Sequence, residues 1–323
     1  MEDISDRYFQ SWLTQKELTW YPQLRGYTLD IACKLLIGLD NGSHTKLGEL
    51  FESWCAGLFS LPINMPWTAF GKAWRSREKL LTEIETLIRA RQTLLQGNPE
   101  RPETDALDIM LNARDEETGE GLSIEELKDQ VLLLLFAGHE TLTSAIASFC
   151  LLTAQNPDVL AKAYAEQSQF AAQPLTLELL KQMTYLDQVI KEVMRLVPPV
   201  GGGFREVLRD CEYGGFTIPK GWATLYQINS THSDSDVFPN PKDFDPDRFA
   251  PDADKRKPFS HVPFGGGLRE CLGKEFARLE MKVFAARLLR DYQWTLLPDQ
   301  DLSMKIVPTP KPRDGLKVRF EKR

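Results

Sequence analysis

The stretch PFGGGLRECLG, residues 263–273, decides the fold of this chain, and an amphipathic segment follows it from Lys274. Its consecutive glycines permit backbone conformations that other residues rarely adopt, and Gly273 lets a flat group approach the backbone closely. The free N–H groups and the dipole at the start of a helix favour a negative charge. The stretch therefore predicts a Cys271 thiolate beside a helix N-terminus, in a loop lined by glycine.

A thiolate with a cation two residues before it suits a planar, anionic metal cofactor. Haem fits this description, with Cys271 as the axial ligand of the iron and Arg269 paired with a propionate. The plain alternative is a free cysteine buried in the core, which is the usual fate of such a residue. Taken alone, the cysteine leaves these two interpretations about equal.

Composition narrows the class of protein. The chain has 323 residues, of which 42% are hydrophobic and 26% charged, so it is globular and large enough for one large domain or two modest ones. Its net charge of −7 argues against a nucleic-acid binder and a polybasic membrane-surface protein. The 5 cysteines are odd in number and widely spaced, which favours a reducing, cytoplasmic compartment over a disulfide framework or zinc site. No signal peptide or membrane-spanning stretch is evident.

A long helix is expected from about Ser123 to Gln155. Ser123 and Glu126 have the spacing of a capping box, and residues 131–137 are apolar on nearly all sides, so this helix should cross the middle of a large domain. Residues 137–141 read AGHET, which introduces a glycine and polar side chains into the helix. Glu140 is unexpected there unless it faces a cavity with water. The plain alternative is a local kink, and a zinc-protease motif is excluded because residue 143 is threonine.

Other segments are less specific. Glu192 and Arg195 lie one helical turn apart and predict a local ion pair, a common feature that is usually solvated. Strands are expected at residues 204–208, 213–218 and 222–228, which carry β-formers between Gly and Pro residues.

Together these segments resemble the cytochrome P450 monooxygenases. The haem-binding signature of that family, F-x-x-G-x-R-x-C-x-G, is filled at every position by Phe264, Gly267, Arg269, Cys271 and Gly273. Residues 137–141 resemble its oxygen-activating motif, although Leu142 stands where many members carry a second hydroxyl residue. Glu192 and Arg195 resemble its structural E-x-x-R, and residues 244–249 its P-x-R-F element, with Arg248 as the third member of an ion-pair network. The four motifs occur in the family's order.

The resemblance implies a fold that is mainly α with small β-sheets, as a single cytochrome P450 domain over residues 1–323 that lacks the family's N-terminal part. It also implies haem b as cofactor, with Cys271 on the iron and Phe264, Gly267, Arg269 and Gly273 around it. Glu140 and Thr141 would relay protons. Arg205 would reach a propionate, and His261 would either touch one or serve the structure. The substrate pocket would be lined by Phe136, Ala137, Val200 and a loop near Pro308.

The wider pattern is most similar to the cyanobacterial retinoid-hydroxylating group and its vertebrate retinoic-acid-hydroxylating relatives. The implied reaction is hydroxylation of a long, apolar substrate such as retinoic acid by a cytoplasmic monomer. It would use O₂ and electrons from a ferredoxin-type donor, for which Arg269, Lys274 and Arg278 could form a basic patch. The alternatives are a peroxygenase or isomerase on the same scaffold, and a haem-poor, inactive fragment or binding protein.

Overall fold

A computed structural model describes residues 1–98, 100–251 and 258–323. The chain is mainly helical with small antiparallel sheets, which confirms the expected fold class. The helices are α1 (Glu2–Gln15), α2 (Trp20–Ile37), α3 (Lys46–Cys55), α4 (Ala69–Gly97), α5 (Ala106–Asn112), α6 (Ile124–Gln155), α7 (Pro157–Ser168), α8 (Leu177–Gln182), α9 (Thr184–Leu196), α10 (Ile228–His232) and α11 (Lys274–Asp291), with short 3-10 turns η1 (Gly42–His44), η2 (Pro246–Phe249) and η3 (Gly267–Arg269).

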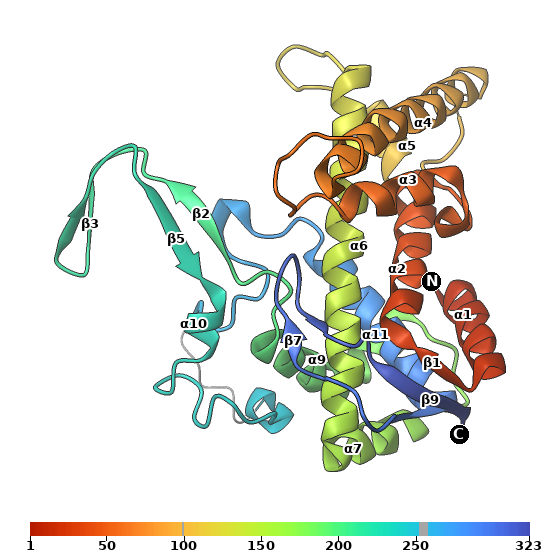
Figure 1. Ribbon diagram of the computed structural model, residues 1–323, viewed down its shortest axis with the longest axis vertical. Coiled ribbons are helices and arrows are strands. Elements are labelled where there is room, and N and C mark those ends of the chain that lie inside the picture. Colours follow the sequence, from red (N-terminus) through yellow and green to blue (C-terminus); the bar gives the residue numbers. More distant parts are fainter. Residues whose placement is uncertain (99, 252–257) are drawn as a thin grey trace. The chain divides into compact units, whose positions relative to one another are not determined.

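The strands form small sheets. One sheet has the order β1 (Glu17–Thr19), β9 (Lys317–Lys322), β6 (Tyr292–Leu296), and the pairs are β2 (Gly202–Glu206) with β5 (Ala223–Gln227), β3 (Cys211–Tyr213) with β4 (Phe216–Ile218), and β7 (Met304–Lys305) with β8 (Lys311–Pro312). The single strand expected at 213–218 is wrong. Gly214 and Gly215 take positive φ values of 59° and 82°, so the chain turns there and makes a hairpin. Figure 1 shows this hairpin beyond the β2–β5 ribbon.

The chain divides into two compact units. The first comprises Met1, Asp3–Tyr8 and Tyr21–Thr143, and the second comprises Glu2, Phe9–Trp20 and Ser144–Arg323. Helix α6, the long helix labelled in Figure 1, contributes to both units, to the first through Thr143 and to the second from Ser144.

Helix α6 is the long helix that the sequence predicts. The expected capping box is formed, since the Ser123 N–H donates to Glu126 Oε2 at 2.8 Å and the Glu126 N–H donates to Ser123 Oγ at 3.3 Å. Among the described residues it is the one helix long and apolar enough to cross a bilayer, and 67% of its most apolar window is buried in the protein. Such burial is typical of a core helix.

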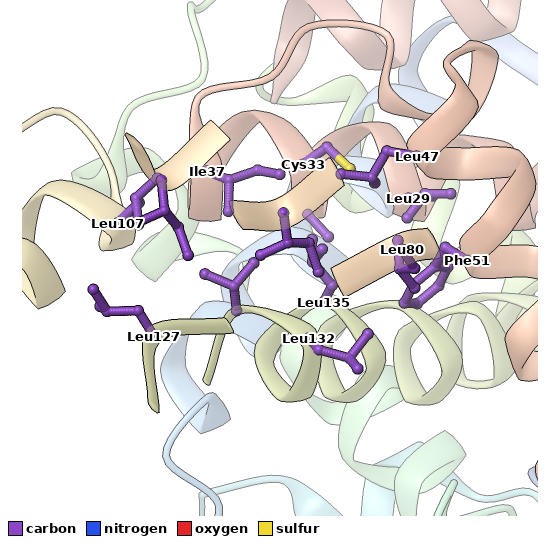
Figure 2. Packing of buried hydrophobic residues seen from close by; sticks show 14 of the residues in the cluster. Leu29, Cys33, Ile37, Leu47, Phe51, Leu80, Leu107, Leu127, Leu132 and Leu135 are labelled. Carbon is purple, nitrogen blue, oxygen red and sulfur yellow. The ribbon is translucent and has the colours of Figure 1, made fainter. Parts of the chain in front are cut away.

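The core of the first unit packs against one side of the N-terminal half of α6. Figure 2 shows Leu132 and Leu135 of α6 beside leucine, isoleucine, cysteine and phenylalanine side chains of other helices. The cluster includes Leu29, Cys33 and Ile37 from α2, Leu47 and Phe51 from α3, and Leu80, Ile84 and Ile88 from α4. This packing fixes which face of α6 is turned towards α2 and α3, and therefore where the polar residues of the AGHET motif lie.

Candidate active site

The Cys271 loop has the backbone that its glycines predict. Gly265 and Gly267 take φ values of 73° and 71°, in the left-handed region that favours glycine. The Cys271 N–H donates to the Phe264 carbonyl at 2.9 Å, and helix α11 begins three residues later at Lys274. The cysteine is exposed, so the alternative of a thiol buried in the core is wrong.

The surface around Cys271 fits a flat, anionic cofactor. Leu268 and Leu272 are fully exposed, which is unusual for neighbouring large apolar side chains and suggests a partner that covers them. A side chain at Gly267 would meet no atom within 4 Å, so the loop leaves open space there. Arg269 is exposed and has no ionic or hydrogen-bond partner within the described part of the chain. Haem could use all three features. The free thiol can ligate its iron, the unpaired cation can pair with a propionate, and the uncovered apolar side chains can pack against its ring.

Tyr226 packs against this loop and was missed in the sequence. A Cβ atom at Gly265 would lie 3.2 Å from the Tyr226 hydroxyl, and one at Gly203 would lie 2.8 Å from it. The Arg205 guanidinium stands over the Tyr226 ring, 4.9 Å from its centroid. Tyr226 thus sets the position of Arg205 and brings the β2–β5 ribbon to the loop. Nothing in the local pattern separates it from an ordinary aromatic strand residue.

Glu192, Arg195 and Arg248 are brought together in the second unit. Arg195 Nε lies 2.7 Å from Glu192 Oε2, and Arg248 Nε lies 3.0 Å from Glu192 Oε1. Unlike most helical ion pairs, this network is buried, with Glu192 and Arg195 side chains at most 1% exposed. Arg195 also donates to the carbonyls of His232 and Pro241, at 2.9 and 2.8 Å. The network therefore holds the irregular segment after α10 against α9.

His261 makes contacts that stabilise the fold. Its Nε2 lies 3.1 Å from the carbonyl of Lys191 in α9, and its ring stacks on His232 at a centroid distance of 5.1 Å. Of the two roles expected for His261, the structural one is the one that these contacts support.

Glu140 is buried and belongs to an ionic cluster of the first unit. Arg25 Nη2 lies 2.7 Å from Glu140 Oε1 and 2.7 Å from Glu52 Oε2, while His139 Nε2 lies 3.2 Å from Glu52 Oε1. Burial acts to raise the pKa of Glu52, but the His139 ring and the Arg25 charge lower it to about 2. The guanidinium of Arg25 stands beside Glu140, so an ion pair accompanies this buried carboxylate. No local pattern in the sequence links Arg25 to Glu140, because the two residues are far apart along the chain.

Thr141 lies on a different face of α6. Its hydroxyl donates to the Ala137 carbonyl at 2.7 Å, and Leu133 and Ala137 are exposed on the same face. Phe136 is turned elsewhere, with its ring edge-on to Trp54 at 5.5 Å. Val200, after α9, is also exposed. The face formed by Leu133, Ala137 and Thr141 thus carries two apolar side chains and one hydroxyl. Such a face suits a mainly apolar substrate.

The expected basic patch is weaker than its residue types suggest. Lys274 is paired with Glu270 at 2.9 Å, and Arg278 lies 3.5 Å from Glu275. Only Arg269 of the three lacks an acidic partner within the described residues.

Comparison with known proteins agrees with this geometry. The cytochrome P450 family model matches residues 26–318. A putative cytochrome P450 120 of Synechocystis sp. is 54% identical over 323 residues, which cover 99% of this chain and 71% of the relative. A beta-amyrin 28-monooxygenase of Kalopanax septemlobus is 38% identical over 328 residues, covering 99% of this chain and 67% of the relative.

A solved structure described as retinoic acid bound cyanobacterial CYP120A1 superposes with a TM-score of 0.92 at 52% identity, over 100% of this chain and 73% of that one. The match extends over every motif described above, and the family implies a haem cofactor, O₂, a redox partner and a small-molecule substrate. The chain belongs to the cytochrome P450 family and is an oxidoreductase of the monooxygenase type.

Proposed function

We propose that the protein hydroxylates a retinoid, or another long and flat apolar acid, with electrons from a ferredoxin-type donor. The observation that supports this substrate class most is the similarity, at 52% identity and a TM-score of 0.92, to a structure with retinoic acid bound. The exposed apolar side chains of Leu133 and Ala137 on this face of α6 add to it, since they suit a mainly hydrocarbon ligand.

The residues of the Cys271 loop would hold haem b. Cys271 would ligate the iron, Gly267 and Gly273 would let the ring plane approach the backbone, and Phe264 would pack against it. Arg269 is free to pair with a propionate, and Arg205 is positioned by Tyr226 for the same task. When bound, haem supplies the redox-active iron at which O₂ is activated, and the thiolate favours cleavage of the O–O bond.

Glu140 and Thr141 would handle protons for this reaction. Arg25 holds the buried Glu140 side chain in place, with its Nη2 atom 2.7 Å from Glu140 Oε1. Adjacent helical residues point about 100° apart, so Glu140 cannot reach the Thr141 hydroxyl while it stays on Arg25. We infer that Glu140 leaves Arg25, takes up a proton from solvent and passes it, directly or through water, to the Thr141 Oγ as that hydroxyl releases its own proton.

Enlarging Ala137 tests the substrate and its location. In the haem-loaded protein, retinoic acid should shift the iron towards high spin. Ala137→Phe should weaken its apparent Kd roughly tenfold or more, because overpacking a filled site typically costs about 1–3 kcal/mol. The measurement is a spectral titration with retinoic acid, and β-amyrin serves as the competing ligand class.

Ala172→Phe is the matched control, since Ala172 is exposed in the loop after α7. It should bind retinoic acid as the unaltered protein does. A shift of the iron towards high spin with β-amyrin, but none with retinoic acid, would refute the proposal that the substrate is a retinoid or a similar apolar acid. Equal binding by Ala137→Phe and the unaltered protein would place the ligand away from this face.

A further inference from the structure

We infer that His232 is a positioning residue for the Cys271 loop, because it ties the end of α9 to the backbone that leads into the thiolate. The inference rests on the proposed role of Cys271 as iron ligand and goes beyond it, since His232 is in none of the motifs described above.

His232 uses both ring nitrogens. Its side chain is fully buried, Nδ1 lies 3.1 Å from the Arg195 carbonyl, and Nε2 lies 2.9 Å from the backbone nitrogen of Val262. A carbonyl can only accept and a backbone N–H can only donate, so Nδ1 carries the proton and Nε2 accepts. These contacts fit one neutral tautomer and exclude the doubly protonated ring.

A continuous series of hydrogen bonds runs from this ring to Cys271. The Val262 N–H donates to His232, and the Val262 carbonyl accepts from the Gly265 N–H at 2.9 Å. The carbonyl of Phe264, one residue earlier, accepts from the Cys271 N–H, also at 2.9 Å. A glycine-rich loop has few side chains to hold it, so these backbone bonds fix its course. The first of them depends on the lone pair of His232.

The other end of the ring is anchored in the ion-pair network. Arg195 Nη1 donates to the His232 carbonyl at 2.9 Å while the His232 ring donates to the Arg195 carbonyl, so the two residues hold each other reciprocally. The groups that face His232 are Arg195 from α9, whose charge Glu192 balances, the stacked His261 ring, and the edge-on Phe238 ring at 6.1 Å. Within the part of the chain that the structure describes, the ring nitrogens of His232 contact the Arg195 carbonyl and the Val262 N–H and no carboxylate.

This environment keeps the ring neutral. Burial lowers the pKa of His232 to about 4, with a further contribution from the Arg195 charge, although the hydrogen bond to the Arg195 carbonyl acts in the opposite direction. The ring therefore keeps the lone pair that Val262 needs throughout the neutral pH range.

Two variants separate the two hydrogen bonds. In His232→Gln the side-chain oxygen can reach the Nε2 position and accept from Val262, whereas in His232→Asn the amide nitrogen reaches the Nδ1 position and donates to Arg195 but leaves Val262 without an acceptor. His44→Asn is the matched control, because His44 is exposed in η1. Each protein is purified with haem and checked for retained helicity by circular dichroism.

Hydrogen exchange reads the loop directly. In the unaltered protein, His232→Gln and His44→Asn, the amides of Val262 and Cys271 should be protected. In His232→Asn they should exchange roughly tenfold or more faster, because a buried N–H without an acceptor loses its bond. The reduced carbonyl spectrum should move from the thiolate type towards the thiol type in His232→Asn and stay in place in His232→Gln.

The outcomes are distinguishable. Equal exchange and equal spectra in His232→Gln and His232→Asn would overturn the inference, and so would an unprotected Val262 amide in the unaltered protein, which is measurable even where a variant does not fold. A thiol-type spectrum in the unaltered protein, with Val262 protected, would instead refute Cys271 as a thiolate ligand and leave the loop attachment standing.

Discussion

Arg195→Met should lower the free energy of unfolding by about 3–5 kcal/mol, the usual cost of removing one partner of a buried ion pair. Glu192 would keep Arg248 at 3.0 Å from its Oε1, but its buried Oε2 would lose the Nε–H of Arg195. The carbonyls of His232 and Pro241 would also lose their donor. Urea denaturation of the haem-loaded protein, followed by circular dichroism, measures the change.

The control is an ion pair of similar chemistry on the surface. Lys274→Met removes the partner of Glu270, and both side chains are substantially exposed, so the loss should stay within about 1 kcal/mol. A loss of that size in Arg195→Met as well would mean that the network of Glu192, Arg195 and Arg248 does not stabilise the fold.

Thr141→Ala should leave haem and substrate binding intact while uncoupling electron consumption from product formation. Without the hydroxyl, the path by which Thr141 would deliver protons would be lost, and reducing equivalents would be released as hydrogen peroxide. The hydroxylated product per electron pair should fall roughly tenfold or more, within the range that a positioned proton donor contributes. The measurement compares product, peroxide and reductant consumed, with a ferredoxin system as electron source.

Thr153→Ala is the matched control, since Thr153 makes the same bond to the carbonyl one turn earlier in α6, at 2.7 Å, but lies outside the AGHET motif. Thr153→Ala should form as much hydroxylated product per electron pair as the unaltered protein. Normal coupling in Thr141→Ala, or equal uncoupling in both variants, would contradict a role for Thr141 in proton delivery.

The local part of this architecture could be predicted from the sequence. The glycines and the cysteine of residues 263–273 act within one loop, and the capping box and apolar run of α6 act within one helix, so pattern and spacing describe them adequately. The ion-pair network of Glu192, Arg195 and Arg248 could be predicted only from the resemblance to the family, whose motifs occur in the same order. The spacing of Glu192 and Arg195 alone indicates only a surface ion pair.

The rest depends on contacts between segments far apart in the sequence. Arg25 meets Glu140 because α2 packs beside α6, and Tyr226 meets the Cys271 loop because β5 pairs with β2. The strand β1 has three residues and exists only through its pairing with β9. A sequence pattern of short range contains none of this information, and for His232 it shows only a polar residue after a strand.

The reduced carbonyl spectrum of Cys271→Ser tests the account most directly. Cys211 is the matched control, because it is the other exposed cysteine, whereas Cys33, Cys55 and Cys150 are buried. The account predicts a thiolate-type spectrum in the unaltered protein and in Cys211→Ser, and its loss in Cys271→Ser. A thiolate-type spectrum that persists in Cys271→Ser would contradict the assignment of Cys271 as the haem ligand.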